Sequence, residues 1–323
     1  MSTKSLRVRV ARIERTATGI HSYELVAKDG GSLPPFEPGA HLDVHTPRGH
    51  VRQYSLCNDA QETHRYVIAV QLEPQGRGGS IALHDTVHEG DTLLVSAPRN
   101  TFPLLHARSY VLVAGGIGIT PLLAMARVLQ RTGAAYELHY CTRSAERTAF
   151  LEELSAPPFA GRVHIHHDGG DPAKGLDVSA LLARRQPGAR LYCCGPGGLM
   201  QAVRAAMRQH GWPAEKTHFE SFTAGGVNTA LGVEDFEFEI TIRSTGAVLN
   251  VPKGQTVLSV LRLNGLQVPS DCEAGNCGTC LTRVCDGEPE HRDSFFRSPE
   301  QAGTDRMLVC VSRARSRRLV LDL

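Results

Sequence analysis

Three cysteines crowd into the segment DCEAGNCGTC, which runs from Asp271 to Cys280 with the spacing C-x4-C-x2-C. Clustered thiols serve disulfide bonds, zinc sites or iron–sulfur clusters, and each use predicts a different protein. The chain has nine cysteines, an odd number, and in a reducing compartment clustered cysteines more often bind metal or do redox work than form disulfides. Structural zinc sites usually join two C-x2-C pairs, whereas this spacing with one further cysteine is typical of a plant-type [2Fe–2S] cluster.

Two later cysteines compete for the position of the fourth ligand. Cys310 lies in the apolar segment MLVCVSRA, which we expect to be a rigid strand that pins the loop, whereas Cys285 lies one short strand beyond the loop. We therefore predict Cys285 to be a bystander. The predicted cluster ligands are Cys272, Cys277, Cys280 and Cys310. Gly275 and Gly278 would let the backbone wrap closely around the cluster and point N–H groups at its sulfurs.

Two segments in the first third of the chain could bind a phosphate-bearing ligand. In RQYSL, which begins at Arg52, strand alternation puts Arg52 and Tyr54 on one face, while Ser55 points the other way or reaches a ligand through its backbone. GRGGS (Gly76–Ser80) offers backbone N–H groups plus Arg77 at a helix start, which suits an anion. An ordinary polar strand would also account for the first segment.

A second pair of motifs is compatible with a dinucleotide. GGIGITP (Gly115–Pro121) sits between an apolar strand and a helix, where a pyrophosphate would lie. Pro121 replaces the third glycine of the usual G-x-G-x-x-G pattern, and HYCTRS offers Arg143 where an ordinary Rossmann dehydrogenase has an acidic residue. CCGP (Cys193–Pro196) follows another predicted strand, although a buried cysteine before a turn would also account for it.

The elements that must position these residues divide the chain into parts. From Leu6 to about Phe102, short period-two segments separated by turn residues predict an antiparallel barrel or sandwich. After about Leu104, apolar strands alternate with helices, including one around ERTAFLEELS, which predicts a doubly wound parallel sheet. A linker composition then precedes a hairpin, one helix, the cysteine loop and two closing strands. The predicted domains are residues 1–103, 104–225 and 236–323, with a linker at 226–235.

One dense histidine group, HIHH (His164–His167), falls on a predicted strand of the parallel sheet. Alternation splits it between two faces, so we expect a solvated strand end rather than a metal site. Nothing else in the sequence suggests an oxygen-activating site, which would need Cys and His pairs or two His with a carboxylate. Electrons carried by this chain must therefore leave for another protein.

Composition excludes several other classes of function. A length of 323 residues allows two or three domains, and a net charge of +2 does not indicate nucleic acid or an anionic membrane as a partner. The N-terminal segment alternates charged and apolar residues, and no run approaches about 20 apolar residues, so we expect a cytoplasmic protein. Cys57, Cys141 and Cys193 are expected to be small buried hydrophobes.

Together the motifs resemble the phthalate dioxygenase reductase-type family, the reductases of aromatic-ring oxygenases and related O-demethylases. DCEAGNCGTCLTRVCDGEPEHRD and MLVCVSRARSRRLVLDL carry the resemblance most clearly, and it extends over the whole chain in the order flavin, nicotinamide nucleotide, ferredoxin. It implies an antiparallel six-stranded β-barrel for the flavin domain and a β-grasp fold for the ferredoxin domain. It also implies FMN rather than FAD, NADH rather than NADPH, and a Rieske-type terminal oxygenase as a transient partner. Arg143 leaves a 2′-phosphate, and hence NADPH, open on the sequence alone.

The resemblance also implies roles for individual residues. Arg52 would pair with the flavin phosphate, Tyr54 would pack on the isoalloxazine or ribityl chain, and Ser55 would hydrogen-bond near N5. The implied FMN contacts are Arg52, Gln53, Tyr54, Ser55, Arg77, Gly78, Gly79, Ser80, Thr120 and Phe222. The implied nicotinamide contacts are Gly115, Gly116, Gly118, Thr120, Pro121, Arg143, Cys194, Gly195 and Pro196. The side chains placed at the reacting rings are Tyr54, Ser55, Thr120 and Cys194.

The function predicted on this basis is that of a reductase component. Hydride from NADH enters FMN, and single electrons leave through the cluster to a separate oxygenase, with a phthalate-like dioxygenase favoured. A flavin is needed because nicotinamide delivers two electrons together whereas the cluster accepts one at a time. The alternatives are a reductase for an O-demethylase or another monooxygenase, and a non-catalytic redox sensor or carrier, which would have no use for the nucleotide motif.

Overall fold

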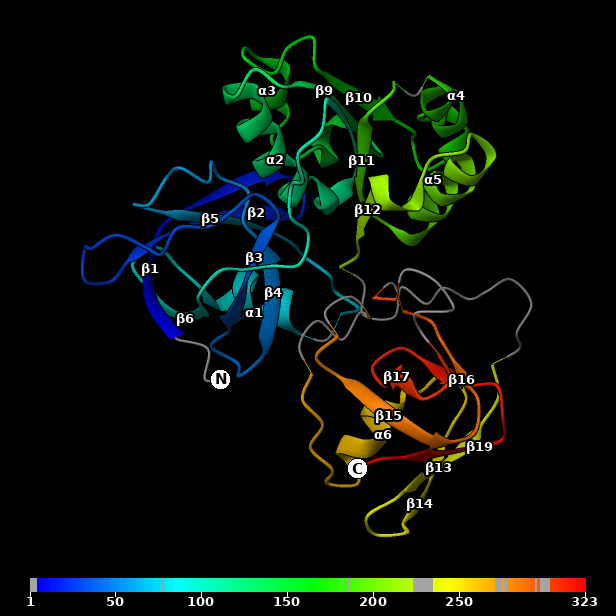
Figure 1. Ribbon diagram of the computed structural model, residues 1–323. Coiled ribbons are helices and arrows are strands. Elements are labelled where there is room, and N and C mark those ends of the chain that lie inside the picture. Colours follow the sequence, from blue (N-terminus) through cyan, green and yellow to red (C-terminus); the bar gives the residue numbers. More distant parts are fainter. Residues whose placement is uncertain are drawn as a thin grey trace. The chain divides into compact units, whose positions relative to one another are not determined.

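The computed structural model describes residues 5–76, 78–184, 186–222, 235–270, 275, 278–293, 295–296 and 303–323. The chain forms two compact units, Met1–Glu220 and Ser221–Leu323 (Figure 1). Within the described ranges, no helix has both the length and the apolar character that crossing a bilayer requires.

The first unit begins with an antiparallel sheet in the order β4-β3-β6-β1-β2-β5, with β7 paired to β3. An antiparallel bridge between Leu56 and Ile68 links the residue after β4 to β5, so the sheet curls toward closure around an apolar core. The predicted antiparallel architecture is confirmed in the form of a curled half-barrel sheet, in which six of the described strands follow one path and β7 adds a seventh strand beside β3. The strands are β1 (Ser5–Ala17), β2 (Ile20–Ala27), β3 (Ala40–His45), β4 (Val51–Ser55), β5 (Tyr66–Gln71), β6 (Thr92–Ser96) and β7 (Arg99–Asn100). The eight-residue helix α1 (Gly79–Thr86) begins within the GRGGS segment, where the sequence indicated a helix start.

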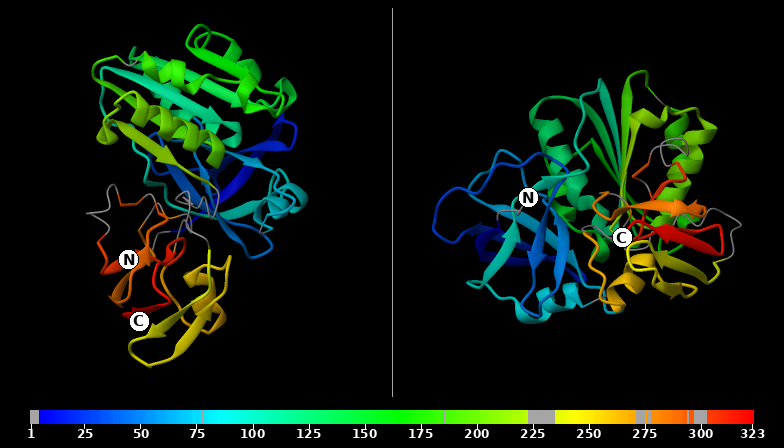
Figure 2. Two further views of the ribbon diagram at one scale, coloured as in Figure 1. Left: turned by 90° about the vertical axis from the view of Figure 1, so that its right-hand side faces the viewer. Right: turned by 60° about the horizontal axis from the view of Figure 1, so that its bottom comes forward.

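The same unit continues into a parallel sheet in the order β10-β9-β8-β11-β12, which confirms the doubly wound prediction. Its apolar clusters show α2 on one face and α4 with α5 on the other, and Figure 2 shows helices on both sides of the sheet. The strands are β8 (Ser109–Gly115), β9 (Ala135–Thr142), β10 (Val163–His167), β11 (Ala189–Cys194) and β12 (Thr217–Glu220). The helices are α2 (Ile119–Arg131), α3 (Leu151–Ser155), α4 (Val178–Ala183) and α5 (Gly197–Gln209). Single 3-10 turns are η1 (Gly116–Gly118), η2 (Ala145–Arg147), η3 (Pro172–Lys174) and η4 (Ala214–Lys216).

Two elements of this sheet differ from the sequence prediction. The helix expected around ERTAFLEELS is divided into η2 and α3, because Phe150 between them adopts a φ of 60°, which breaks the helical path. The linker-like composition that precedes the predicted linker at 226–235 extends back to Phe219, yet Phe219 and Glu220 belong to β12 and pair with Cys193 and Cys194 of β11. Pairing with a sheet edge therefore overrides the loop-like composition that begins immediately afterwards.

The second unit contains a five-stranded mixed sheet in the order β14-β13-β19-β15-β17 and a two-stranded ribbon, β16 with β18. The buried face of α6 (Val257–Leu263) shares one apolar cluster with the strands, as expected for the predicted β-grasp ferredoxin domain. The strands are β13 (Phe238–Ile242), β14 (Val248–Val251), β15 (Leu281–Asp286), β16 (Pro289–Glu290), β17 (Arg306–Leu308), β18 (Arg313–Ala314) and β19 (Arg318–Leu321).

The placement of Cys310 within a strand was wrong. β17 ends at Leu308, and the N–H groups of Val311 and Ser312 both donate to the Leu308 carbonyl oxygen, so the backbone turns around Cys310. The apolar character of MLVCVSRA comes from burial of this turn in the core, with Cys310 only 3% exposed, rather than from continued strand pairing.

Candidate redox site

Strand β4, with the residue before it, and the start of α1 form a cradle for an anion. Gly79 is the first residue of α1, and a Cβ placed there would overlap the Arg52 side chain of β4. Gly78 precedes it with a φ of 81°, and a Cβ there would lie 2.8 Å from His50 Nε2. Only glycines therefore let Arg52 cross the N-terminus of α1, where backbone N–H groups and the guanidinium together suit a phosphate. Arg77 lies outside the described residues.

The side chains of two other predicted flavin contacts are engaged within the protein. Ser80 Oγ accepts a hydrogen bond from the Glu73 N–H at 3.0 Å. Gln53 Nε2 donates to Asp43 Oδ1 at 3.3 Å, an oxygen that also accepts from Arg99 Nη2 at 2.6 Å. Ser80 thus holds the turn before α1, and Gln53 braces β4 against β3.

Tyr54 lies on the same face of β4 as Arg52, as alternation predicted, because the residue between them points the other way. Burial raises the pKa of Tyr54 to about 12, so the phenol stays neutral at ordinary pH. A neutral, largely buried aromatic ring beside an arginine is suited to packing against another planar ring.

The two glycine-containing motifs of the parallel sheet meet at its carboxyl edge. A Cβ at Gly118 would overlap the carbonyl oxygen of Cys194, and one at Gly195 would lie 2.9 Å from the Cα of Gly115. Gly116 has a φ of 52°, which also favours glycine. The structure thus brings GGIGITP and CCGP into direct backbone contact.

This meeting point is the topological switch point of the sheet. β8 and β11 are neighbours, and the helices that follow them, α2 and α5, lie on opposite faces. In open α/β sheets, ligands bind in the crevice where successive helices diverge in this way. The placement was foreseen from the order of elements and supports a nucleotide site at these glycines.

The remaining predicted nucleotide residues surround the same edge. Thr120 is buried in the first turn of α2, and its Oγ1 donates to the Ile117 carbonyl oxygen at 3.0 Å. Pro121 is also buried in this first turn, where a missing N–H removes no intrahelical bond. Arg143 follows β9 directly and is exposed, and Pro196 precedes α5.

A residue that the sequence did not single out, Glu220, lies at the centre of this arrangement. Glu220 ends β12 and pairs in register with Cys194 at the end of β11. Burial raises the pKa of Glu220 to about 8, and the nearby Ser55 hydroxyl offsets only part of that rise. The available sequence signal was a period-two segment, THFE, after α5, which the adjoining linker composition obscured.

Two buried polar atoms meet here with their hydrogen-bonding capacity unused. Ser55 comes from the antiparallel sheet and Glu220 from the parallel sheet, and the two side chains are near each other. Among the described residues, however, neither Ser55 Oγ nor Glu220 Oε2 has a partner with hydrogen-bond geometry. Buried polar groups are normally satisfied, so such a pair indicates a missing polar ligand. The edge of a flavin or nicotinamide ring carries the required donors and acceptors, and the residues present therefore fit these groups.

The thiols around this edge are protonated rather than reactive. Burial raises the pKa of Cys194 well above its ordinary value, and that of Cys193 to about 12. Burial likewise raises the pKa values of Cys57 and Cys141 to about 12. Cys57 and Cys193 are buried, which confirms the prediction for these two, whereas Cys141 is only partly buried.

The described parts of the cysteine loop fit a cluster site. Gly275 and Gly278 have φ values of 75° and 79°, and side chains there would collide with Val311 and with the ring of Phe295. Cys280 and Cys310 are both buried, and the Val309 N–H donates to the Cys280 carbonyl oxygen at 3.5 Å. Cys272 and Cys277 lie outside the described residues.

Cys285 lies away from this loop. It is exposed on β15, where Arg243 Nη1 lies 3.7 Å from its Sγ. It stands four positions after Leu281, or about 13 Å along an extended strand, too far for a shared cluster with Cys280. Phe222, the remaining predicted flavin contact, belongs to the second unit and is 43% exposed.

Comparison with known proteins supports these assignments of cofactor and fold. Residues 240–315 match the family described as a 2Fe-2S iron-sulfur cluster binding domain. The tert-butanol monooxygenase / tert-amyl alcohol desaturase reductase subunit of Aquincola tertiaricarbonis is 48% identical, covering 99% of this chain and 96% of that protein. The vanillate O-demethylase oxidoreductase of Pseudomonas sp. (strain HR199 / DSM 7063) is 46% identical, covering 98% of this chain and all of that protein.

A solved structure also matches nearly the whole length of the chain. It is that of phthalate dioxygenase reductase, described as a modular structure for electron transfer from pyridine nucleotides to [2Fe–2S]. The two chains are 46% identical with a TM-score of 0.76, covering 99% of this chain and 98% of the other. The chain therefore belongs to the phthalate dioxygenase reductase-type family, oxidoreductases with FMN, NADH and a plant-type [2Fe–2S] cluster that serve as reductase components of oxygenase systems.

Proposed function

We propose that this chain delivers electrons from NADH to a Rieske-type terminal oxygenase, with a phthalate-like dioxygenase as the favoured partner. One observation carries the proposal. The motifs GGIGITP and CCGP come together at the switch point of the sheet, and the hydrogen-bonding atoms Ser55 Oγ and Glu220 Oε2 are left unsatisfied there. When bound, FMN takes up the two electrons of a hydride together and releases them one at a time, which the cluster requires.

At the flavin end of the proposed site, positive charge binds the phosphate of FMN. Arg52 and the N-terminus of α1 bind the FMN phosphate, with Gly78 and Gly79 keeping the cradle open and Arg77 completing it. Ser80 and Gln53 act by fixing the backbone of the cradle and of β4. Tyr54 packs its neutral ring against the flavin, and Ser55 presents its buried hydroxyl to the polar edge.

The nucleotide end is shaped by close backbone approach. The N–H groups from Gly115 to Gly118 bind the pyrophosphate of NADH, and Gly195 lets the two motifs touch. Cys194 offers an uncharged thiol that packs beside the nicotinamide, and Arg143 reaches the ribose from the end of β9. Thr120 keeps the first turn of α2 in place, because its hydroxyl is bound to the Ile117 carbonyl oxygen.

In the second unit, four cysteines carry the cluster in this proposal: Cys272, Cys277, Cys280 and Cys310. The joint burial of Cys280 and Cys310 supports them, as does the distance of Cys285 along β15. Phe222 is proposed to cover the flavin face at which nicotinamide stacks. The predicted three-domain division, with a linker at 226–235, remains part of the proposal.

There are two other candidate functions: a reductase for a different oxygenase partner, which the relatives support, and a carrier without turnover, which the nucleotide site argues against. A reductase for an O-demethylase or a monooxygenase is supported by relatives of 46–48% identity that serve such systems. A carrier without turnover would leave the nucleotide site without a purpose.

The test begins with purified holoprotein, NADH and cytochrome c as an artificial acceptor. Continuous NADH oxidation supports a catalytic reductase. Reduction of the bound cofactors that stops after a single turnover would point to the carrier. The same preparation is then combined with isolated Rieske-type dioxygenase, O-demethylase and non-Rieske monooxygenase components. Product formation with the Rieske-type dioxygenase at the highest rate supports our proposal, and equal or greater turnover with a non-Rieske component contradicts it.

A further inference from the structure

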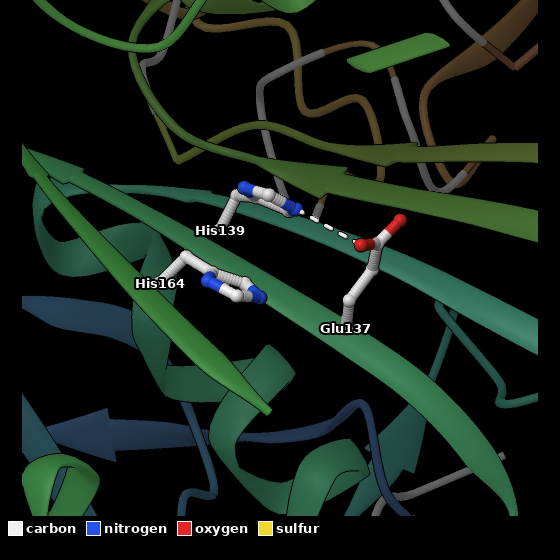
Figure 3. Close-up of side chains that lie close together, drawn as sticks. All are labelled: Glu137, His139 and His164. Atoms are coloured by element: carbon white, nitrogen blue, oxygen red, sulfur yellow. Dashed lines mark ion pairs between the residues drawn. The ribbon is translucent and has the colours of Figure 1, made fainter. Parts of the chain in front are cut away.

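Three potential metal ligands converge on one face of the parallel sheet, away from the switch point (Figure 3). Glu137 and His139 lie two residues apart on β9, so they share a face, and His164 of β10 pairs in register with His139. One ligand atom of each lies within 4.8 Å of the other two. Figure 3 shows the Glu137 carboxylate and both imidazoles pointing into the same space.

The HIHH segment is exposed at His164 and His167, as the prediction of a solvated strand end implies, and the buried histidine of this cluster comes from the neighbouring strand β9. Alternation does divide the histidines of β10 between two faces, but the neighbouring strand supplies His139 and Glu137 to one of them. His139 is only 4% exposed, so it is a buried imidazole rather than a solvated one. Sequence alone could not show this, because the pairing of β9 with β10 joins residues 25 positions apart.

The buried His139 has a ring nitrogen aimed at the cluster without a hydrogen-bond partner. Within the described residues, Nε2 is buried and unsatisfied, and it lies 3.4 Å from Glu137 Oε2. A cation between the two atoms would satisfy both.

A further histidine fixes the orientation of His139. His139 Nδ1 lies 3.0 Å from His166 Nε2, and with the proton on Nδ1 this contact is a donated hydrogen bond. The Nε2 lone pair then faces Glu137 and His164. Metal-binding imidazoles are usually held in this way, with the other nitrogen donating to a neighbouring acceptor.

We propose that Glu137, His139 and His164 bind a divalent late first-row cation such as Zn²⁺, with water completing the coordination. Two imidazoles and a carboxylate suit zinc, whose bonds to such ligands are about 2.0–2.2 Å. Two ligands at that distance in a tetrahedron lie about 3.4 Å apart, which is the distance between His139 Nε2 and Glu137 Oε2. His164 is exposed and stacks on the His139 ring with 4.9 Å between the ring centroids, so a rotation of its side chain can close the third position.

The cation site is separate from the proposed redox chemistry. His139 pairs with Val113, which belongs to the apolar cluster of α4 and α5, so the site lies on that face of the sheet. Its effect is to tie the edge strand β10 to β9. The proposed cation site therefore does not depend on the proposed oxygenase partner.

The test is calorimetric titration of full-length holoprotein with Zn²⁺ after loosely bound metal has been removed on a chelating resin. We expect one zinc ion per chain. His164→Ala and Glu137→Gln should each weaken binding by at least roughly 10- to 100-fold, the loss seen when even a supporting group of a metal site is removed. His167→Ala is the matched control, because His167 lies on the other face of β10, against Thr148 Oγ1 at 3.1 Å, and should leave affinity unchanged.

Zinc K-edge absorption identifies the ligands independently of the iron. We expect only nitrogen and oxygen neighbours at about 2.0–2.1 Å. Undiminished zinc affinity in His164→Ala, or a sulfur shell at about 2.3 Å, which indicates thiols instead, overturns the proposal. FMN content and NADH oxidation should be normal in all three variants, which shows that each is folded.

Discussion

Replacing Glu220 by glutamine should remove a pH-dependent component of stability from the first unit. Glutamine has nearly the shape of protonated glutamate and cannot ionise. In the native chain the Glu220 pKa is raised from 4.5 to about 8, chiefly by burial. When folding raises the pKa of an acid, the acid makes its full contribution to stability at pH values below its pKa in the unfolded chain. This contribution is lost as the pH rises through the pKa of the folded protein.

The size of the effect follows from the same values. At about 1.4 kcal/mol for each pH unit, a rise from 4.5 to about 8 corresponds to up to about 5 kcal/mol, lost between about pH 4.5 and pH 8. The native protein should therefore lose stability over this range relative to Glu220→Gln. With roughly 2–4 °C per kcal/mol for a unit of this size, the melting temperatures should diverge by roughly 10 °C by pH 8.

The assay is thermal unfolding at a series of pH values between 5 and 8.5, followed by the fluorescence of released FMN. Glu215→Gln serves as the matched control, because Glu215 is exposed on η4, five residues earlier. We expect the Glu220→Gln curve to rise progressively above that of the native protein, while the control follows the native curve. Parallel curves for native protein and Glu220→Gln would refute the assignment of Glu220 as a buried acid at this site.

Three other predictions concern the cofactor sites. Arg52→Ala should weaken FMN binding roughly tenfold to hundredfold, since a charge-assisted phosphate contact contributes about 1.5–3 kcal/mol; flavin retention on dialysis measures this, and unchanged retention would move the phosphate site elsewhere. Gly118→Ala should raise the KM for NADH while leaving FMN content intact, because the added Cβ overlaps the Cys194 carbonyl oxygen. An unaltered KM for NADH would argue against a nucleotide at this contact. Cys310→Ser should abolish the visible absorption of the cluster and Cys285→Ser should not, and the reverse pattern would show that the ligand assignment is wrong.

Much of the fold follows from local patterns in the sequence. Period-two segments predicted the barrel strands, and the alternation of strands with helices predicted the parallel sheet, because both patterns are set by burial of neighbouring residues along one element. The meeting of Gly118 with Cys194 was also accessible, since parallel strands place their carboxyl ends at one edge.

The features that escaped prediction depend on contacts between distant segments. Glu220 is recognisable only once β12 is seen to pair with β11, and His139 joins His164 only through the register of β9 with β10. The turn at Cys310 was missed for a related reason, because apolar residues buried in a turn resemble those of a strand. Burial by itself therefore does not distinguish a strand from a turn packed into the core.

The central claim is that electrons enter at the nucleotide site, pass through FMN and leave through the cluster. Its most direct test is anaerobic rapid mixing of the holoprotein with NADH, following flavin and cluster absorbance separately, alongside a chain truncated before Phe236. The full chain should show flavin bleaching first and cluster reduction afterwards. The truncated chain should bind FMN and be reduced at a near-normal rate, yet fail to reduce cytochrome c efficiently or to support a Rieske partner. Cluster reduction that precedes flavin reduction, or oxygenase turnover by the truncated chain equal to that of the full protein, would contradict the proposed path.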